Sequence, residues 1–188
     1  MDRRNALRNL GILTGGMVLL PSCDFSQEKV SLVLNKLSIK ASEESLMKEL
    51  VSCIIPEGDM PGAASLKVDG FVWVMVDDCL NDKDQSRFLK GLHSFEATVK
   101  KSNGKSFLSM EQDERETTLT EILNKTSKTT ESAEDEIKFF VSMTKNLTAY
   151  GYMKSEYIMK EVMPYTLIPG SYGPCETVDY SKRINVNG

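Results

Sequence analysis

The sequence predicts an all-α protein: a small, irregular bundle of about five to six helices followed by an extended tail rich in proline and glycine. Apolar residues recur at helical spacing throughout residues 42–163, in runs that polar stretches with glycine, asparagine or proline separate. No hairpin turn signal joins these runs, and strands do not alternate with helices as they would in a parallel sheet.

Composition limits the classes of protein to consider. Of the 188 residues, 40% are hydrophobic and 27% are charged, which suffices for one domain with a core and excludes a membrane-embedded body. The net charge is −4, and because residues 1–22 carry three arginines against one aspartate, the rest of the chain is more acidic still. An acidic chain without a stripe of lysine or arginine repels phosphate backbones, so we expect no binding to nucleic acid.

Residues 1–22 have the pattern of an export signal peptide. A basic start precedes an apolar stretch, residues 10–20, which is too short to cross roughly 30 Å of bilayer hydrocarbon. The adjacent Arg3 and Arg4 are similar to a twin-arginine signal, which exports proteins that have already folded. An ordinary signal that contains two neighbouring arginines remains the alternative.

The signal ends in LLPSC, residues 19–23, which is similar to the lipobox of bacterial lipoproteins. In a lipobox the cysteine, here Cys23, becomes the lipidated first residue, and its acyl chains hold a soluble body at a bilayer surface. A cysteine that follows an ordinary cleavage site is the alternative. We expect a lipoprotein anchored to a membrane and facing the periplasm.

Residues 23–41 are predicted to form a tether, in which apolar residues alternate with polar ones as in a short strand. The helical domain, residues 42–163, then begins with a helix that Ser42 caps and that ends at Pro56. The apolar face of this helix consists of Leu46, Leu50, Val51, Ile54 and Ile55.

Residues 68–80 fit two structures. Their FVWVMV run is β-branched and aromatic, as in a buried strand, but the apolar residues also lie at helical spacing. The next residues, Asp77 and Asp78, give no hairpin signal. We therefore predict a buried helix with both carboxylates on a solvated face.

A third helix is predicted to start near Asn81 or Asp82 and to end at Gly104. Its inward stripe consists of Phe88, Leu92, Phe95 and Val99. Ser109 and Gln112 have the spacing of a capping box, which predicts the start of a fourth helix. Its inward residues are Leu119, Ile122 and Leu123.

A fifth helix is predicted between Ser132, which caps it, and Gly151, which ends it. Its core-facing residues are Ile137, Phe140, Val141, Thr144 and Leu147. The polar stretch before it, residues 124–135, is expected to contain a loop, and a short sixth helical piece is expected at residues 155–163.

The last segment, residues 164–188, is predicted to be an irregular tail. Three prolines interrupt it, so it cannot form a regular helix or a central strand. Its side chains are too apolar for a tail free in solvent, so it either covers the chain's own helices or contacts a partner protein. We expect the partner contacts at Tyr165, Leu167, Ile168, Tyr172 and Cys175, because tyrosines offer a large contact area with one polar tip.

Residues that could carry chemistry are scarce. The sequence lacks a glycine-rich dinucleotide-binding turn and a CxxCH haem motif, and its four cysteines are too scattered for zinc or iron–sulfur ligation. The single histidine, His93, is expected to be a structural or surface residue. We therefore predict no catalytic residue, no cofactor and no metal in this chain.

If Cys23 carries lipid, three thiols remain, and an odd number leaves one unpaired. Cys53 and Cys79 are expected on apolar helix faces, where they act as small hydrophobic residues. Cys175, in the tail, is then the odd cysteine. A free thiol, a bridge to Cys53 or Cys79, and a disulfide to a partner all remain open for it.

Four blocks of the sequence resemble the gluconate 2-dehydrogenase subunit 3 family and occur in that family's order. They are IIP…DMPGA at residues 54–63, DDC…FLKGL at 77–92, YGYMKSE at 150–156 and PGSYGPC at 169–175. From the first block to the last they span most of the chain between Leu46 and Cys175.

The resemblance implies a small, non-catalytic subunit of a membrane-associated dehydrogenase. In such complexes the large subunit is an FAD-dependent flavoprotein of the glucose–methanol–choline oxidoreductase family that oxidises a sugar or sugar acid. A cytochrome c subunit, with haem c, often passes the electrons on. The small subunit supplies the export signal and stabilises the large one. The lipobox at Cys23 is not general in the family, which suggests that this chain also provides the membrane anchor.

Two other functions fit the sequence less closely. A free-standing exported lipoprotein could bind a saccharide, with Trp73 as the platform on which the sugar stacks. An autonomous helical oxidoreductase would use Glu156 and Tyr157 near a pocket.

Overall fold

A computed structural model describes residues 30–125, 132–163, 165 and 168. Their secondary structure consists of the helices α2 (Ala41–Ile54), α3 (Val68–Cys79), α4 (Asp82–Asn103), α5 (Gln112–Asn124) and α6 (Ala133–Met153). A 3-10 turn, η1 (Phe107–Ser109), precedes α5, and a π-helical turn, η2 (Ile158–Val162), follows α6. The described residues contain no strand, so the all-α prediction is confirmed, including the helix at the ambiguous residues 68–80.

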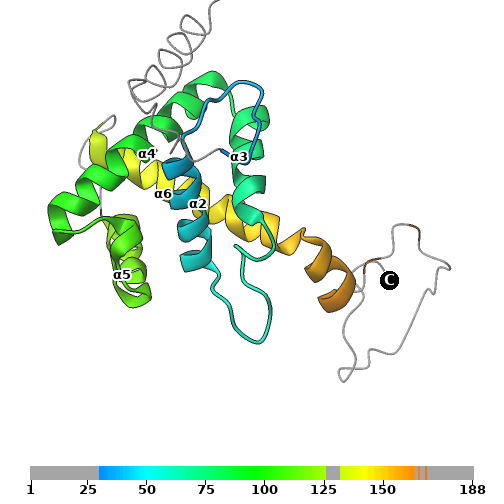
Figure 1. Ribbon diagram of the computed structural model, residues 1–188. Coiled ribbons are helices and arrows are strands. Elements are labelled where there is room, and N and C mark those ends of the chain that lie inside the picture. Colours follow the sequence, from blue (N-terminus) through cyan, green and yellow to red (C-terminus); the bar gives the residue numbers. More distant parts are fainter. Residues whose placement is uncertain (1–29, 126–131, 164, 166–167, 169–188) are drawn as a thin grey trace, which may run out of the picture.

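Helix α6 is the element around which the others are arranged (Figure 1). It contacts α2, α3, α4, α5 and η2, and its contact with α4 is the most extensive. The two helices meet at Gly91, where an added Cβ would lie 2.6 Å from the Cβ of Phe140 and would overlap the carbonyl oxygen of Glu136. Only glycine therefore lets the backbone of α4 approach α6 this closely.

Five aromatic side chains form the centre of the core, and all of them are fully buried. They belong to α3, α4, η1 and α6, and they are Trp73, Phe88, Phe95, Phe107 and Phe140. Successive rings meet edge to face at centroid distances between 4.9 and 6.2 Å. This is the favoured geometry for aromatic pairs, because the positive ring edge points at a negative ring face.

Several predicted helix ends are confirmed. Asn81 caps α4 by accepting a hydrogen bond from the backbone N–H of Asp84, and Ser132 caps α6 in the same way through Asp135. Gly104 ends α4 in the left-handed conformation, with φ of 74°. These contacts join residues close together in the sequence, which is why the sequence pattern indicates them.

The predicted caps Ser42 and Ser109 are wrong. Helix α2 begins at Ala41, after Lys40, and α5 begins at Gln112, after Glu111. In both cases a glutamate carboxylate three residues further on accepts the backbone N–H of the residue before the helix, at 2.8 Å in α2 and 3.0 Å in α5. A carboxylate at the positive end of a helix replaces the predicted serine hydroxyl.

The predicted end of the fifth helix at Gly151 is also wrong, since α6 continues to Met153. An added Cβ at Gly151 would overlap the ring of Phe71 on α3. The glycine therefore serves the close approach of α3 and α6, and not the end of the helix.

We predict that Gly91→Ala destabilises the fold by about 1–3 kcal/mol, because the new methyl group would force α4 and α6 apart. Gly70→Ala is the matched control on a helix, since its Cβ would lie 3.6 Å from the nearest side-chain atom, an ordinary contact. It should leave stability unchanged or raise it by up to about 1 kcal/mol. Urea unfolding of both variants measures the difference, and equal stability of the two would contradict the assigned packing.

Candidate functional site

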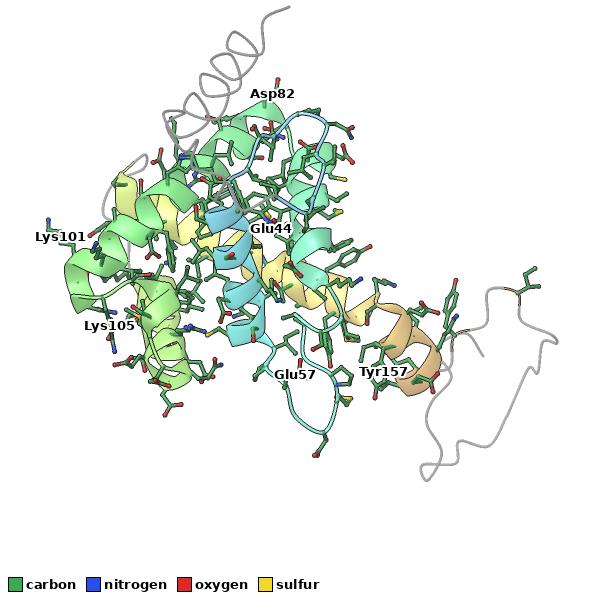
Figure 2. The ribbon with its side chains drawn as sticks, viewed as in Figure 1. Glu44, Glu57, Asp82, Lys101, Lys105 and Tyr157 are labelled. Carbon is green, nitrogen blue, oxygen red and sulfur yellow. The ribbon has the colours of Figure 1, made fainter. Side chains whose placement is uncertain are left out.

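Most of the predicted site residues lie outside the described part of the chain: Arg3, Arg4, Cys23, Leu167, Tyr172 and Cys175. Two predicted partner contacts, Tyr165 and Ile168, are described, and both are exposed. The backbone N–H of Tyr165 donates to the carbonyl of Met159 at 2.9 Å. The predicted tail therefore starts against η2, the turn that begins directly after Tyr157 (Figure 2).

Asp77 fastens the N-terminal segment, residues 30–40, to the helical body. Its carboxylate accepts backbone hydrogen bonds from Asn35, Lys36 and Leu37, at 2.6, 3.0 and 2.7 Å. Asp77 is buried, so the predicted solvated position of its carboxylate is wrong. The described part of the predicted tether is not a strand, and its residue Ile39 is buried in the core.

The charge of Asp77 suits this role. Burial raises the pKa of the carboxyl, but the three backbone donors and the nearby Lys36 charge outweigh burial and hold the pKa below its ordinary value. The side chain thus stays ionised while the donors satisfy it. Sequence reasoning missed this site, although Asp77 lies four residues after the buried Trp73 and so on the same helix face.

A pocket of about 640 Å³ lies between the N-terminal segment, α2 and the start of α3. Its polar lining includes Ser31, Glu44, Lys48 and Asp69. Burial, together with the negative charge of Glu44, raises the pKa of Asp69 in spite of backbone hydrogen bonds and the charge of Lys48. No aromatic side chain is among the described lining residues, so this part of the lining offers no ring on which a sugar could stack.

Trp73, the predicted saccharide platform, is fully buried and packs edge-on against Phe88. It is a core residue, which removes the feature that suggested saccharide binding. Glu156 and Tyr157, the residues predicted for an oxidoreductase, do line a pocket of about 420 Å³. Glu156 is, however, an exposed side chain whose pKa is lowered by its hydrogen bond from Lys160, as in a surface ion pair.

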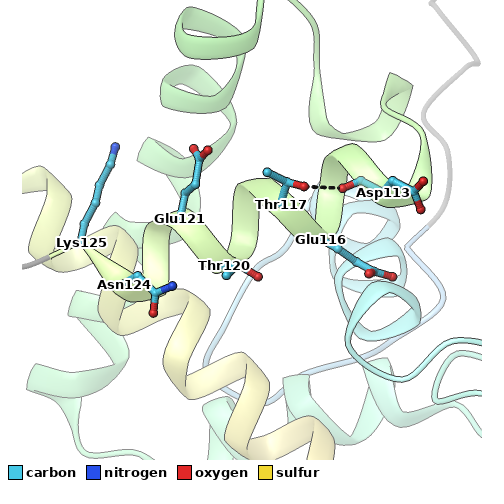
Figure 3. A pocket seen from close by; sticks show the side chains of 7 residues that line it. All are labelled: Asp113, Glu116, Thr117, Thr120, Glu121, Asn124 and Lys125. Atoms are coloured by element: carbon cyan, nitrogen blue, oxygen red, sulfur yellow. Dashed lines mark hydrogen bonds between the residues drawn. The ribbon is translucent and has the colours of Figure 1, made fainter.

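Another pocket, of about 690 Å³, has a described lining that comes from one side of α5 and Lys125 (Figure 3). Its carboxylates, those of Asp113, Glu116 and Glu121, belong to exposed residues. The hydroxyl of Thr117 donates to the backbone carbonyl of Asp113 at 2.8 Å, as threonine often does within a helix. This surface is a solvated helix face, and no nucleophile and base are paired on it.

His93 is mostly exposed, and its Nε2 lies 3.0 Å from a carboxylate oxygen of Glu43 on α2. Cys53 is a buried free thiol, and burial, together with the negative charge of Glu116, raises its pKa to about 11, so it is unreactive near neutral pH. Cys79 is exposed at the last turn of α3 and not on an apolar face as predicted. Within the described ranges, no cluster of histidine, cysteine or carboxylate groups could hold a metal ion.

Two of the four sequence blocks meet in the fold. The hydroxyl of Tyr152 on α6 donates to the carbonyl of Pro61, at 3.0 Å. Pro61 belongs to the loop between α2 and α3, and at the neighbouring Gly62 an added Cβ would lie 2.8 Å from backbone atoms of Pro56 and Glu57. The backbone N–H of Ala63 closes the loop on the carbonyl of Ile55. These contacts fix both ends of the loop, while its residues 56–60 are exposed.

No helix in the described part of the chain is long and apolar enough to cross a bilayer. Comparison of the sequence with protein families gives one match, the family described as gluconate 2-dehydrogenase subunit 3, over residues 41–170. The matched residues include every described helix from α2 to η2. No curated protein and no solved structure matches the sequence.

We predict that Asp77→Asn loosens the N-terminal segment, because a neutral amide offers the three N–H donors a weaker acceptor. Backbone hydrogen exchange at residues 35–37 should become faster at pH 7. The control is Asp78→Asn, since the exposed Asp78 carboxylate accepts from the side chain of Asn35, at 3.1 Å, and from no backbone N–H within residues 30–40. Unchanged exchange in Asp77→Asn would contradict the assigned role.

The same carboxylate predicts a pH dependence. Its folded pKa lies below the unfolded value of about 3.9, so its contribution to stability is fully present above that value. The contribution is lost as the pH falls through the folded pKa, when the carboxylate gains a proton. Thermal unfolding between pH 7 and pH 2 should therefore show a smaller acid-dependent loss of stability in Asp77→Asn than in the wild type.

Proposed function

The chain belongs to the gluconate 2-dehydrogenase subunit 3 family, and from this membership we propose that it is the small, non-catalytic subunit of an exported dehydrogenase complex. In the proposal it escorts, stabilises and tethers a large subunit that carries out the oxidation. The family match, over more than half of the chain, is the observation that carries the proposal.

The partner we propose is an FAD-dependent flavoprotein of the glucose–methanol–choline oxidoreductase family that acts on a sugar or sugar acid. A third subunit with haem c would receive the electrons. The flavin would belong to the partner, since this sequence has no glycine-rich turn to hold a dinucleotide. The substrate would also be selected by the partner.

The described side chains support a structural subunit. The residues that could act in catalysis or binding have structural roles. His93 lies at the surface beside Glu43, Cys53 is a buried thiol with a raised pKa, and Trp73 is part of the core. The extensive contact of α6 with the other helices supplies a well-packed body. A subunit that stabilises a larger protein needs such a body and an adhesive surface.

The proposed escort function depends on the N-terminus. Arg3 and Arg4 would direct twin-arginine export, so a flavoprotein that has bound its cofactor in the cytoplasm could cross the membrane together with this chain. Cys23 would then hold the complex on the periplasmic side of a membrane through its lipid. The hydrogen bonds of Asp77 support this arrangement, because they connect the segment that follows the signal to the helical body.

The proposed contacts in the tail are Tyr165, Leu167, Ile168, Tyr172 and Cys175. Exposure of Tyr165 and Ile168 supports a role at an interface, because both side chains are available to a partner. A disulfide between Cys175 and the large subunit is one of the arrangements that this proposal includes.

We predict that the isolated chain does not oxidise sugars in the presence of an artificial electron acceptor. In the assembled complex, His93→Ala should leave the turnover number nearly unchanged, because His93 is a surface residue paired with Glu43. Turnover by the isolated chain would refute the non-catalytic assignment. So would a loss on the order of ten-thousandfold in His93→Ala, which is typical of a deleted catalytic group.

A second prediction concerns export. Arg3→Lys combined with Arg4→Lys should block export and leave the dehydrogenase in the cytoplasm, whereas Cys23→Ser should release both chains from the membrane in soluble form. Cell fractionation and immunoblotting of both polypeptides measure the outcome. Normal export of both chains in the double variant would refute an escort by the twin-arginine route.

A further inference from the structure

Large apolar side chains are exposed on α3 and on the C-terminal half of α6, and these two helices are in contact. Val74 is 41% exposed, Tyr150 is 53% exposed and Met153 is 46% exposed. The ring of Phe71 connects the two helices, since it packs on Gly151 and its centroid lies 6.0 Å from that of Tyr150. Val74 follows Phe71 by three residues and Met153 follows Tyr150 by three, so each pair shares a helix surface. These four residues form the α3–α6 face.

The α3–α6 face is uncharged. Residues 70–76 of α3 and 146–153 of α6 contain no charged side chain, although 27% of the whole chain is charged. The core of a protein–protein interface is depleted in charge and enriched in tyrosine, phenylalanine and methionine. The other strongly exposed apolar residues of the described helical body, Met60 and Leu108, belong to two separate segments, and single exposed residues of that kind are normal.

We propose that the α3–α6 face is the surface on which the dehydrogenase subunit docks. The proposal rests on the proposed function, because membership in a family of complex subunits implies a partner polypeptide. It adds a location that the sequence blocks do not give: Phe71 and Val74 lie outside all four of them. The face would contribute the apolar centre of the interface.

The position of the tail supports this occupant. Turn η2 contacts α6 directly after the face, and the tail begins at η2 through the hydrogen bond from Tyr165 to Met159. A partner on the α3–α6 face would therefore also meet the start of the tail, where Tyr165 is exposed. The face and the tail contacts would form one continuous interface.

Charged residues at the edge of the α3–α6 face indicate which charges the surface of the partner should carry. Lys154, which is exposed, follows Tyr150 by four residues and so lies beside it. At the α3 edge, the carboxylate of Asp78 accepts a hydrogen bond from the side chain of Asn35. The partner surface that fits is thus apolar, with a carboxylate opposite Lys154.

The first test compares two lysine substitutions in the full chain, co-expressed with the FAD-dependent dehydrogenase polypeptide of the same complex. Val74→Lys should weaken the complex about tenfold or more, because it places a charge in the apolar centre of the interface. Leu108→Lys is the matched control, since Leu108 is 39% exposed on η1, and it should leave the affinity unchanged. Thermal melts of the purified variants verify that both fold.

Equal affinities of the two lysine variants would overturn the location while leaving the proposed function intact. Failure of the wild-type chain to bind the dehydrogenase at all would instead overturn the proposed function. The two failures are therefore distinguished by the wild-type measurement.

The second test identifies the occupant even if Val74→Lys does not fold. A photo-crosslinking amino acid replaces Tyr150 in the assembled complex, and mass spectrometry identifies the attached peptide. We expect a peptide of the dehydrogenase. Attachment to a second copy of this chain, or to the chain's own residues 166–188, would overturn the proposal, because either result would show that the face has a different occupant.

Discussion

The close approach of α4 to α6 at Gly91 is the constraint on which the rest of the fold depends. Without a side chain at this position, the two backbones come close enough for Phe88 and Phe95 of α4 to meet Phe140 of α6 edge to face. The same rings then contact Trp73 of α3 and Phe107 of η1. Because all five rings are fully buried, a shift of α4 along α6 would also break the packing of α3 and η1.

A second constraint is electrostatic. The N-terminal segment, residues 30–40, has no helix or strand to pair its backbone, and the charged carboxylate of Asp77 is buried. The segment supplies three backbone N–H donors, which stabilise the charge of Asp77. The carboxylate in turn supplies the acceptor that these three N–H groups need. An irregular segment can therefore lie against the core without unsatisfied polar groups at this point.

Helix α3 connects the parts of the molecule that the proposed function needs. Its last turn holds residues 35–37 through the carboxylate of Asp77, and its exposed side contributes Phe71 and Val74 to the α3–α6 face. In the proposed complex, an attachment to the membrane and an attachment to the dehydrogenase would thus be made through the same buried helix. For both attachments to be firm, that helix must be well packed in the core. Neither attachment requires a reactive group.

The sequence by itself determined which segments are helical, because that information lies in the spacing of apolar residues and in contacts over three or four positions. The caps Asn81 and Ser132 and the left-handed Gly104 are of this kind, as is α3 in spite of its strand-like composition. The spacing of Asp77 and Trp73 in the sequence also places Asp77 on the buried face of its helix. The sequence does not show that Asp77 binds the N-terminal segment, because the N–H donors lie about forty residues away. Only the tertiary structure decided that Gly151 continues its helix and receives the ring of Phe71, and that Phe71 and Tyr150 lie side by side. Such contacts join residues far apart in the chain, so no local pattern of the sequence specifies them.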